Sequence, residues 1–120
     1  MKNTKHLLLI IFLALATSVF AQDKTESVKV YGNCEMCKSR VEKAIQIDGV
    51  KKAGWDVDTK MLTVTYDSGK TNFSDIQKKV AAAGHDTENV RAEDAIYKKL
   101  PGCCRYDRKA QTESHSGHKH

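Results

Sequence analysis

Residues 27–45 read SVKVYGNCEMCKSRVEKAI, and this stretch decides the fold. Ser27–Tyr31 alternates along its length and is rich in β-forming residues, so it predicts a strand. Cys37–Ile47 carries apolar residues at positions 41, 44, 45 and 47, a nearly helical spacing that predicts a helix. Gly49 follows this segment and is typical of a helix stop. The loop between the two elements, Gly32–Cys37, therefore leads into the start of a helix.

Further elements follow up to residue 91. They are a strand at Val50–Val57, a turn at Asp58–Lys60, a strand at Met61–Tyr66, a helix that starts at Phe73 after an Asn72 cap and stops at Gly84, and a short strand at Thr87–Arg91. The order β-α-β-β-α-β predicts an α+β, ferredoxin-like sandwich, in which two helices cover one face of a four-stranded antiparallel sheet. The predicted core is apolar and consists of Val28, Val30, Val41, Ile45, Trp55, Leu62, Val64, Ile76 and Val80.

The first 21 residues have the features of a secretory signal peptide. Lys2 and Lys5 form a basic head, the unbroken apolar run Leu7–Ala16 follows, and the segment ends with Thr17–Ala21 before the cleavage site. From Leu7 to Ala21 this segment has 15 residues, fewer than the roughly 20 that span a bilayer. Cleavage after Ala21 is therefore favoured over an uncleaved membrane anchor. The predicted organisation is a signal peptide (1–21), a linker (22–26), a domain (27–91) and a C-terminal extension (92–120).

The chain that remains after this cleavage has 18 basic and 15 acidic residues, a formal net charge of +3. It has no basic stripe with interleaved aromatic residues, so nucleic acid is not predicted as a partner. The predicted location is the periplasm, with no stable membrane insertion after cleavage. Because that compartment is oxidising, a free thiol there needs a function.

The motif that carries chemistry is the pair Cys34 and Cys37, at the end of the first loop and the start of the first helix. Two thiols so placed can converge on one ion about 2.3 Å from each sulfur. The positive end of the helix, with Lys38 and Arg40, favours the thiolate form that binds metal. Two thiolates suit a soft ion of low coordination number, Cu(I) first, with Hg(II), Zn(II) and Cd(II) as alternatives.

The same stretch resembles the heavy-metal-associated domain family, over residues 27 to about 91. The matching features are the C-x-x-C after the first strand, the segment Arg40–Ile45, the pair Gly49-Val50 and the run Ala83-Gly84-His85. The family includes copper chaperones, mercury-binding periplasmic proteins and domains of metal-pumping ATPases. The resemblance implies that Cys34 and Cys37 bind a soft metal ion and pass it to a partner by ligand exchange.

Two positions depart from the family pattern. The family usually has Met two residues before its first cysteine, where this chain has Gly32, and a methionine lies inside the motif as Met36. An aromatic residue or Lys usually occupies the position of His85. His85 is therefore a candidate third ligand or hydrogen-bond donor to a thiolate, against the alternative of a solvent-facing residue after a helix stop. Met36 is a further candidate ligand, against the alternative of contact surface.

Cys103 and Cys104 lie in the extension, outside the resemblance. The residues 92–102 can span at most about 36 Å when extended, enough to return the second pair of cysteines to the first. A shared thiolate site, a disulfide and unreactive thiols are all open for this pair. His115, His118 and His120 form a further candidate metal site at the end of the chain, against the alternative of a solubilising tail.

The function predicted from the sequence is that of an exported, non-enzymatic carrier that binds Cu(I) through Cys34 and Cys37 and transfers it by thiolate exchange. The partner is a metal-transporting ATPase or another metal transporter or acceptor protein, and the carrier is a monomer, with a metal-bridged dimer left open. A scavenger of mercury or another toxic metal is the alternative within the binding class. A thiol-disulfide oxidoreductase is the alternative enzyme, but the only proline, Pro101, lies far from the position expected in a thioredoxin-like protein.

Overall fold

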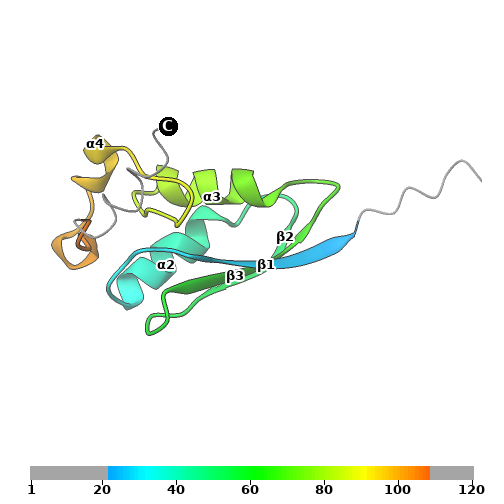
Figure 1. Ribbon diagram of the computed structural model, residues 1–120, viewed down its shortest axis with the longest axis horizontal. Helices are drawn as coiled ribbons and strands as arrows, with labels where there is room; N and C mark the ends of the chain where they lie inside the picture. The colour runs from blue at the N-terminus through cyan, green and yellow to red at the C-terminus, as the bar shows by residue number, and fades with distance from the viewer. Residues whose placement is uncertain (1–21, 109–120) are drawn as a thin grey trace, which may run out of the picture.

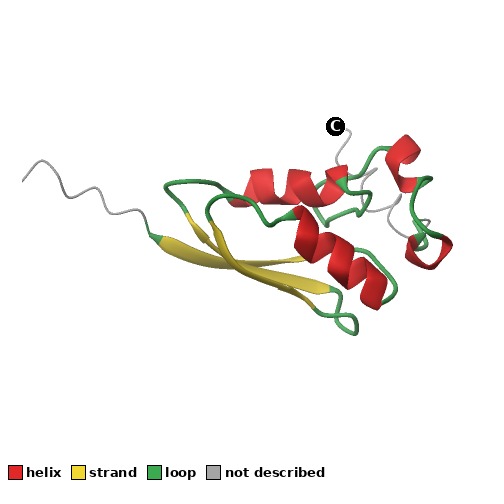
Figure 2. Cartoon of the chain, turned by 180° about the vertical axis from the view of Figure 1, so that it is seen from behind, coloured by secondary structure: helices red, strands yellow, loops and turns green. Residues whose placement is uncertain are grey.

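The computed structural model describes residues 22–108. Its elements are β1 (Asp23–Lys29), α2 (Glu35–Ala44), β2 (Val50–Trp55), β3 (Met61–Asp67), α3 (Phe73–Ala82), α4 (Asp94–Tyr97) and the 3-10 helix η2 (Gly102–Cys104). The predicted α+β architecture is confirmed, because α2 and α3 lie together on one face of an antiparallel sheet (Figures 1 and 2). The start of α2 lies at the opposite end of the domain from the start of β1 (Figure 1).

The sheet has three strands within residues 22–108, in the order β1-β3-β2, where four were predicted. At the predicted fourth strand, Thr87–Arg91, the structure has only an isolated bridge between Val30 and Thr87. The physical reason is a turn, because the Thr87 Oγ1 accepts hydrogen bonds from the N–H groups of Asn89 (3.2 Å) and Val90 (2.9 Å). The side chain of Thr87 thus closes the backbone into a turn where a strand would continue straight.

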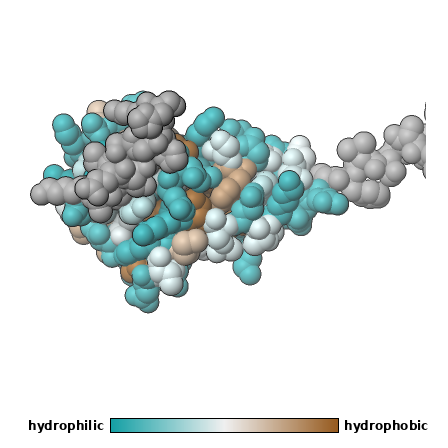
Figure 3. All heavy atoms as spheres, viewed as in Figure 1, coloured by the Kyte–Doolittle hydropathy of each residue, from teal (hydrophilic) through white to brown (hydrophobic). Residues whose placement is uncertain are grey.

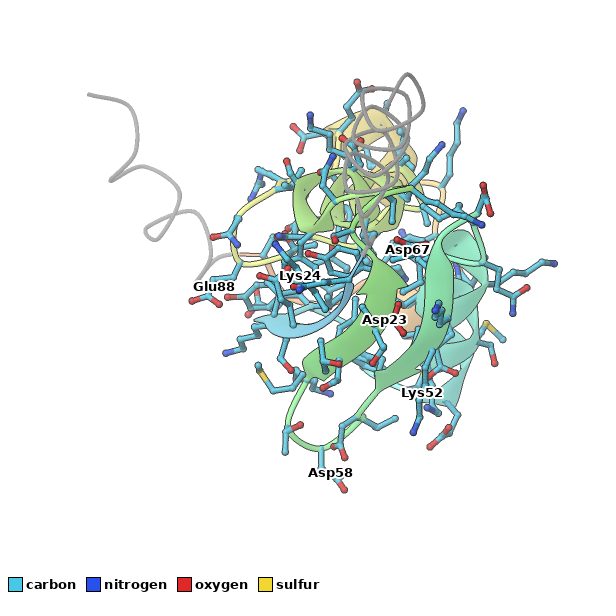
Figure 4. All side chains as sticks on the ribbon, turned by 90° about the vertical axis from the view of Figure 1, so that its right-hand side faces the viewer. Asp23, Lys24, Lys52, Asp58, Asp67 and Glu88 are labelled. Atoms are coloured by element: carbon cyan, nitrogen blue, oxygen red, sulfur yellow. The ribbon has the colours of Figure 1, made fainter. Side chains whose placement is uncertain are left out.

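β1 starts earlier than predicted and takes up residues 23–26, which were expected to form a linker. These residues pair with β3 in register from Asp23 opposite Asp67, and Thr25 and Thr65 share a side-chain hydrogen bond of 2.9 Å. Figure 4 looks from this end of the sheet, with Asp23 and Asp67 labelled, and places Asp58 at the tip of the β2–β3 turn. Residues 23–27 are all polar and exposed, so they show no alternation of apolar and polar residues. The sequence therefore did not predict that the strand includes its first residues.

Both helices lie close to their predicted positions. α2 starts at Glu35 and ends at Ala44, so Gly49 does not stop it but forms the turn before β2 with a φ of 96°. The Asn72 cap of α3 is confirmed, since its side chain accepts the Asp75 N–H at 2.8 Å. Gly84, with a φ of 101°, ends the turn after α3 as predicted.

All nine predicted core residues are buried, none more than 3% exposed. Trp55 is the largest of them, and its indole N–H donates to the backbone carbonyls of Val30 (3.0 Å) and Lys60 (3.2 Å). In the coloured part of Figure 3, hydrophilic side chains surround a narrow strip of hydrophobic ones. Met36 and Met61 are the large hydrophobic residues that the described part of the chain exposes.

The C-terminal segment, residues 92–108, folds back on the domain at the end where α2 starts (Figure 1). Leu100, Cys104 and Tyr106 of this segment are buried with the core of the domain. The predicted signal peptide and the histidines 115, 118 and 120 lie outside the described residues. In the part of the chain that the structure describes, no helix is long and apolar enough to cross a membrane.

Candidate metal centre

Cys34 and Cys37 converge at the start of α2, which the sequence predicted as the site. Cys34 precedes the helix in extended conformation and is half-buried, while Cys37 lies in the first turn and is fully buried. Their sulfurs are 3.5 Å apart. The N–H of Asn33 points back at the Cys37 sulfur at 3.3 Å. The two thiols therefore face the same small volume between the loop and the helix.

Gly32 and Trp55 shape the loop from below. A Cβ atom at position 32 would lie 3.0 Å from the Cys37 Cβ and 3.1 Å from the Trp55 ring. The Trp55 ring thus fills the space next to the loop, and a side chain at position 32 would crowd both the ring and Cys37. This accounts for the glycine at a position where the family usually has Met. The tryptophan was predicted as a core residue, but its support of the loop was not.

The two sulfurs differ in their electrostatic surroundings. The N–H of Cys37 at the start of α2 is the largest influence on Cys34 and, with lesser contributions from neighbouring groups, lowers the pKa of its thiol to about 7. Lys38 was predicted to favour the thiolate form with its positive charge, but it pairs with Glu42 at 2.5 Å, and the carboxylate offsets that charge. Cys34 is therefore the thiol that the start of the helix favours as a thiolate.

Cys104 joins this pair from the C-terminal segment. The ligand atoms of Cys34, Cys37 and Cys104 all lie within 4.8 Å of one another. Cys104 is completely buried, and burial raises the pKa of its thiol. Among residues 22–108, these three cysteines form the group of His, Cys, Asp or Glu side chains close enough to hold one ion. The reach of residues 92–102, estimated from chain length, is thus sufficient in the folded protein.

Cys103 faces outward beside the cluster. Its sulfur is 3.9 Å from that of Cys104 and 3.5 Å from the Met36 sulfur, and its side chain is exposed. Its carbonyl oxygen accepts hydrogen bonds from the Asn33 side chain (3.3 Å) and the Cys34 thiol (3.6 Å). All four cysteines are free thiols in the structure. Met36, half-exposed, lies on the surface next to Cys103 and outside the three-thiol cluster.

His85 is neither exposed nor part of the cluster. It is fully buried, its Nδ1 lies 2.9 Å from the Tyr31 carbonyl oxygen, and its ring stacks on Tyr106. Burial lowers the pKa of the imidazole, which favours its neutral form. The solvent-facing alternative is therefore wrong, and the geometry gives this residue a packing role between the domain and the C-terminal segment.

The residues that hold the C-terminal segment were not found from the sequence. The Tyr106 hydroxyl donates to the Gly84 carbonyl oxygen (2.8 Å) and accepts the Asp86 N–H (2.7 Å). Arg108 forms a two-point ion pair with the buried Asp86, at 2.8 and 2.9 Å. These contacts join residues about twenty positions apart. They follow no periodic pattern of the sequence, so a local reading of the sequence does not predict them.

Comparison with known proteins places this geometry in a family. The sequence model of the heavy-metal-associated domain matches residues 33–86. The mercuric transport protein periplasmic component of Pseudomonas aeruginosa is 34% identical over 74 residues, which cover 60% of this chain and 81% of that protein. The protein of the same name from Shewanella putrefaciens is 34% identical over 80 residues, 65% of this chain and 88% of its own length.

The chain belongs to the heavy-metal-associated domain family. Among solved structures, the CopZ metallochaperone is 33% identical with a TM-score of 0.52, over 53% of this chain and 98% of its own. Oxidized MerP from Ralstonia metallidurans CH34 is 32% identical with a TM-score of 0.53, over 55% of this chain and 94% of its own. The metal-binding and chaperone proteins of this family are not enzymes, so this chain is a metal-binding protein without catalytic activity.

Proposed function

We propose that this protein is an exported carrier that binds a soft metal ion through Cys34 and Cys37 and passes it to another protein by thiolate exchange. The observation that carries the proposal is the pair of free sulfurs 3.5 Å apart at the start of α2. Sulfurs at that separation need only a small shift to bind one ion at about 2.3 Å each. The pKa of Cys34, lowered to about 7, makes its thiolate available near neutral pH.

Two ions fit this donor set, Cu(I) and Hg(II), because both are soft and accept two or three thiolates. Cu(I) is favoured by the likeness to a copper binding domain from HMA7, a P-type ATPase, which is 28% identical to this chain. Hg(II) is favoured by the sequence relatives, which are named mercuric transport proteins. Zn(II) and Cd(II) fit less well, since a closed zinc site takes four ligands and the described cluster offers three.

Export is supported by two observations. Residues 1–21 have the composition of a signal peptide, and the sequence relatives are named periplasmic components. The proposed partner is a metal transporter or a metal-transporting ATPase. In the transfer step, a partner thiolate adds to the ion first and a carrier thiolate leaves afterwards, so that free ion is never released.

The test is an anaerobic titration of the reduced chain from Gln22 to His120 with Cu(I) and, separately, with Hg(II), each against a chelator of known affinity. We expect one ion per chain, bound tightly by wild type and lost in Cys34→Ser/Cys37→Ser. Ser39→Ala, an exposed change on the same helix, is the matched control and keeps full binding.

The ion that competes better against its chelator identifies the cargo. Failure of the wild type to bind either ion contradicts the proposed function. Turnover of a disulfide substrate that depends on Cys34 and Cys37 would identify an oxidoreductase in its place.

A further inference from the structure

The C-terminal segment lies beyond the part of the chain that the family model matches, which ends at residue 86. It nevertheless brings a fully buried sulfur, that of Cys104, to within 4.8 Å of the sulfurs of Cys34 and Cys37. Burial alone is ordinary for a cysteine, so the feature that needs an explanation is the nearness of this thiol to two others from a different part of the chain. The surroundings of Cys104 show how it is held there.

Three anchors fix the segment on the domain, and none involves a cysteine side chain. Leu100 packs against Gly84, where a Cβ atom would lie only 2.9 Å from the Leu100 Cδ2. Tyr106 is hydrogen-bonded to the backbone on both sides of His85. Arg108 pairs with Asp86, which is 0% exposed, and its guanidinium lies over the Tyr97 ring, 4.4 Å from the ring centroid. Because these anchors flank η2, the position of Cys104 is set by the fold.

The segment also forms hydrogen bonds directly to the metal loop. The carbonyl oxygen of Cys103 accepts hydrogen bonds from the Asn33 side chain and from the Cys34 thiol. The backbone of η2 is thereby joined to the first cysteine and to the residue before it. These hydrogen bonds hold the loop and the segment together beside the three sulfurs.

The distances favour three ligands over two. In a trigonal site, sulfurs about 2.3 Å from the ion are about 4.0 Å apart, whereas the two sulfurs of a linear site are about 4.6 Å apart. Cys34 and Cys37 are 3.5 Å apart, and all three sulfurs lie within 4.8 Å of one another. The three thiols therefore approach a triangle of the right size, while a linear site requires the first pair to separate by about 1 Å.

We propose that Cys104 is the third thiolate of a trigonal soft-metal site and that residues 92–108 form a strap that closes this site over the ion. The proposal rests on the proposed function, since it concerns the same ion. The protein is then a carrier that holds its cargo with three sulfurs. In the transfer step a partner thiolate adds to the ion, and Cys104 is the first carrier thiolate to leave it as the strap opens.

The test is X-ray absorption spectroscopy of the chain from Gln22 to His120 loaded with one equivalent of Hg(II). Hg(II) discriminates well, since it readily accepts only two thiolates and takes a third where the protein holds one in place. We expect three sulfurs around the ion in wild type and in Cys103→Ser, and two in Cys104→Ser. Cys103→Ser is the matched control, because it makes the same change at the adjacent, exposed residue.

Competition against a thiol chelator supplies a second readout. We expect Cys104→Ser to lose affinity by at least the roughly 10- to 100-fold that follows loss of an outer-shell partner, and Cys103→Ser to stay close to wild type. Two sulfurs in the wild type overturn the strap proposal even if Cys104→Ser fails to fold, and they leave the two-thiolate function intact. Absence of Hg(II) binding in the wild type contradicts the proposed function for that ion instead.

Discussion

The two cysteine pairs are held in place by different means. Cys34 and Cys37 lie at the start of a ten-residue helix, and the second of them is part of the domain core. Cys103 and Cys104 lie on a three-residue 3-10 helix whose position depends on side-chain anchors before and after it. The buried Cys37 can leave its place only if the domain core opens, whereas the second pair can leave by local opening of a short segment. A carrier that must both hold and release an ion needs one firm set of ligands and one that yields.

The largest effect is expected from a substitution that removes the support of the first cysteine pair. Trp55 is 1% exposed, and its ring packs against the metal loop. Trp55→Ala leaves a large cavity there, which lowers the free energy of unfolding by about 3 to 5 kcal/mol. We expect the free energy of unfolding in urea to fall by that amount and metal binding to weaken with it. Lys52→Ala on the same strand, an exposed position, is the control. An unchanged unfolding midpoint for Trp55→Ala would contradict this role of the ring.

The next effect concerns the yielding side. Arg108→Ala leaves the buried Asp86 carboxylate without its main ion pair, a loss of about 3 to 5 kcal/mol if the charge stays buried. Because opening of the strap returns Asp86 to water at a lower cost, we expect the segment to detach and the domain to stay folded. The measurement is the rate at which maleimide labels Cys104 in the metal-free protein, followed by mass spectrometry.

Labelling of Cys104 should rise steeply in Arg108→Ala while that of Cys37, in the domain core, stays slow. Arg105→Ala, an exposed arginine on the same segment, is the control and should change neither rate. Equal acceleration at both cysteines would mean that segment and domain open as one unit, against the comparison drawn above.

A smaller effect is expected from Tyr106→Phe. It removes the hydroxyl that joins Gly84 and Asp86 and leaves the buried Asp86 N–H without a partner, which costs about 1 to 3 kcal/mol. Labelling of Cys104 should therefore rise, but less than in Arg108→Ala. Tyr31→Phe, in a half-buried ring that stacks on Tyr106, is the control. A rate for Tyr106→Phe that equals the control would show that ring packing alone holds the segment.

The smallest effect is expected at the β2–β3 turn, which begins directly after Trp55. The N–H groups of Thr59 and Asp58, which donate to Asp56, lower the pKa of this exposed carboxyl below its ordinary value of 3.8. The folded state therefore gains stability from Asp56 above pH 3.8, and loses it as the pH falls through the lower folded-state pKa. Asp56→Asn should lower Tm slightly at neutral pH and weaken its decline in acid, with no change in the labelling of any cysteine. A change in Cys104 labelling would reveal a coupling between this turn and the strap.

Local patterns in the sequence were sufficient for the domain and for the first cysteine pair. The spacing of Val41 and Ile45 predicts a helix, Asn72 announces the next one, and the alternation at Leu62 and Val64 predicts the central strand. Each of these signals lies within a few residues, where backbone geometry alone sets the periodicity. The motif at Cys34 and Cys37 was found in the same way, although the ligand roles of these residues remain a proposal.

The sequence was insufficient where side chains close the structure. The hydroxyl of Thr87 turns the chain away from the predicted fourth strand, and its neighbours in sequence do not reveal this. The pairing of Tyr106 with Gly84 and of Arg108 with Asp86 depends on the folded shape of the domain, so the path of the strap could be bounded by chain length but not traced. The burial of His85 follows from the same contacts, because the Tyr106 ring covers it.

The turn at Thr87 also bears on how the protein behaves in concentrated solution. It leaves β1 as an edge of the sheet, paired on its outer side, within residues 22–108, only around the bridge at Val30. An edge strand with free backbone groups is a template on which other chains can aggregate. The exposed side chains of β1 bear charges of both signs, among them Asp23, Lys24 and Lys29, and charges on an edge oppose such stacking. Substitutions that remove these charges are therefore where fibre formation should first be sought in a preparation of this protein.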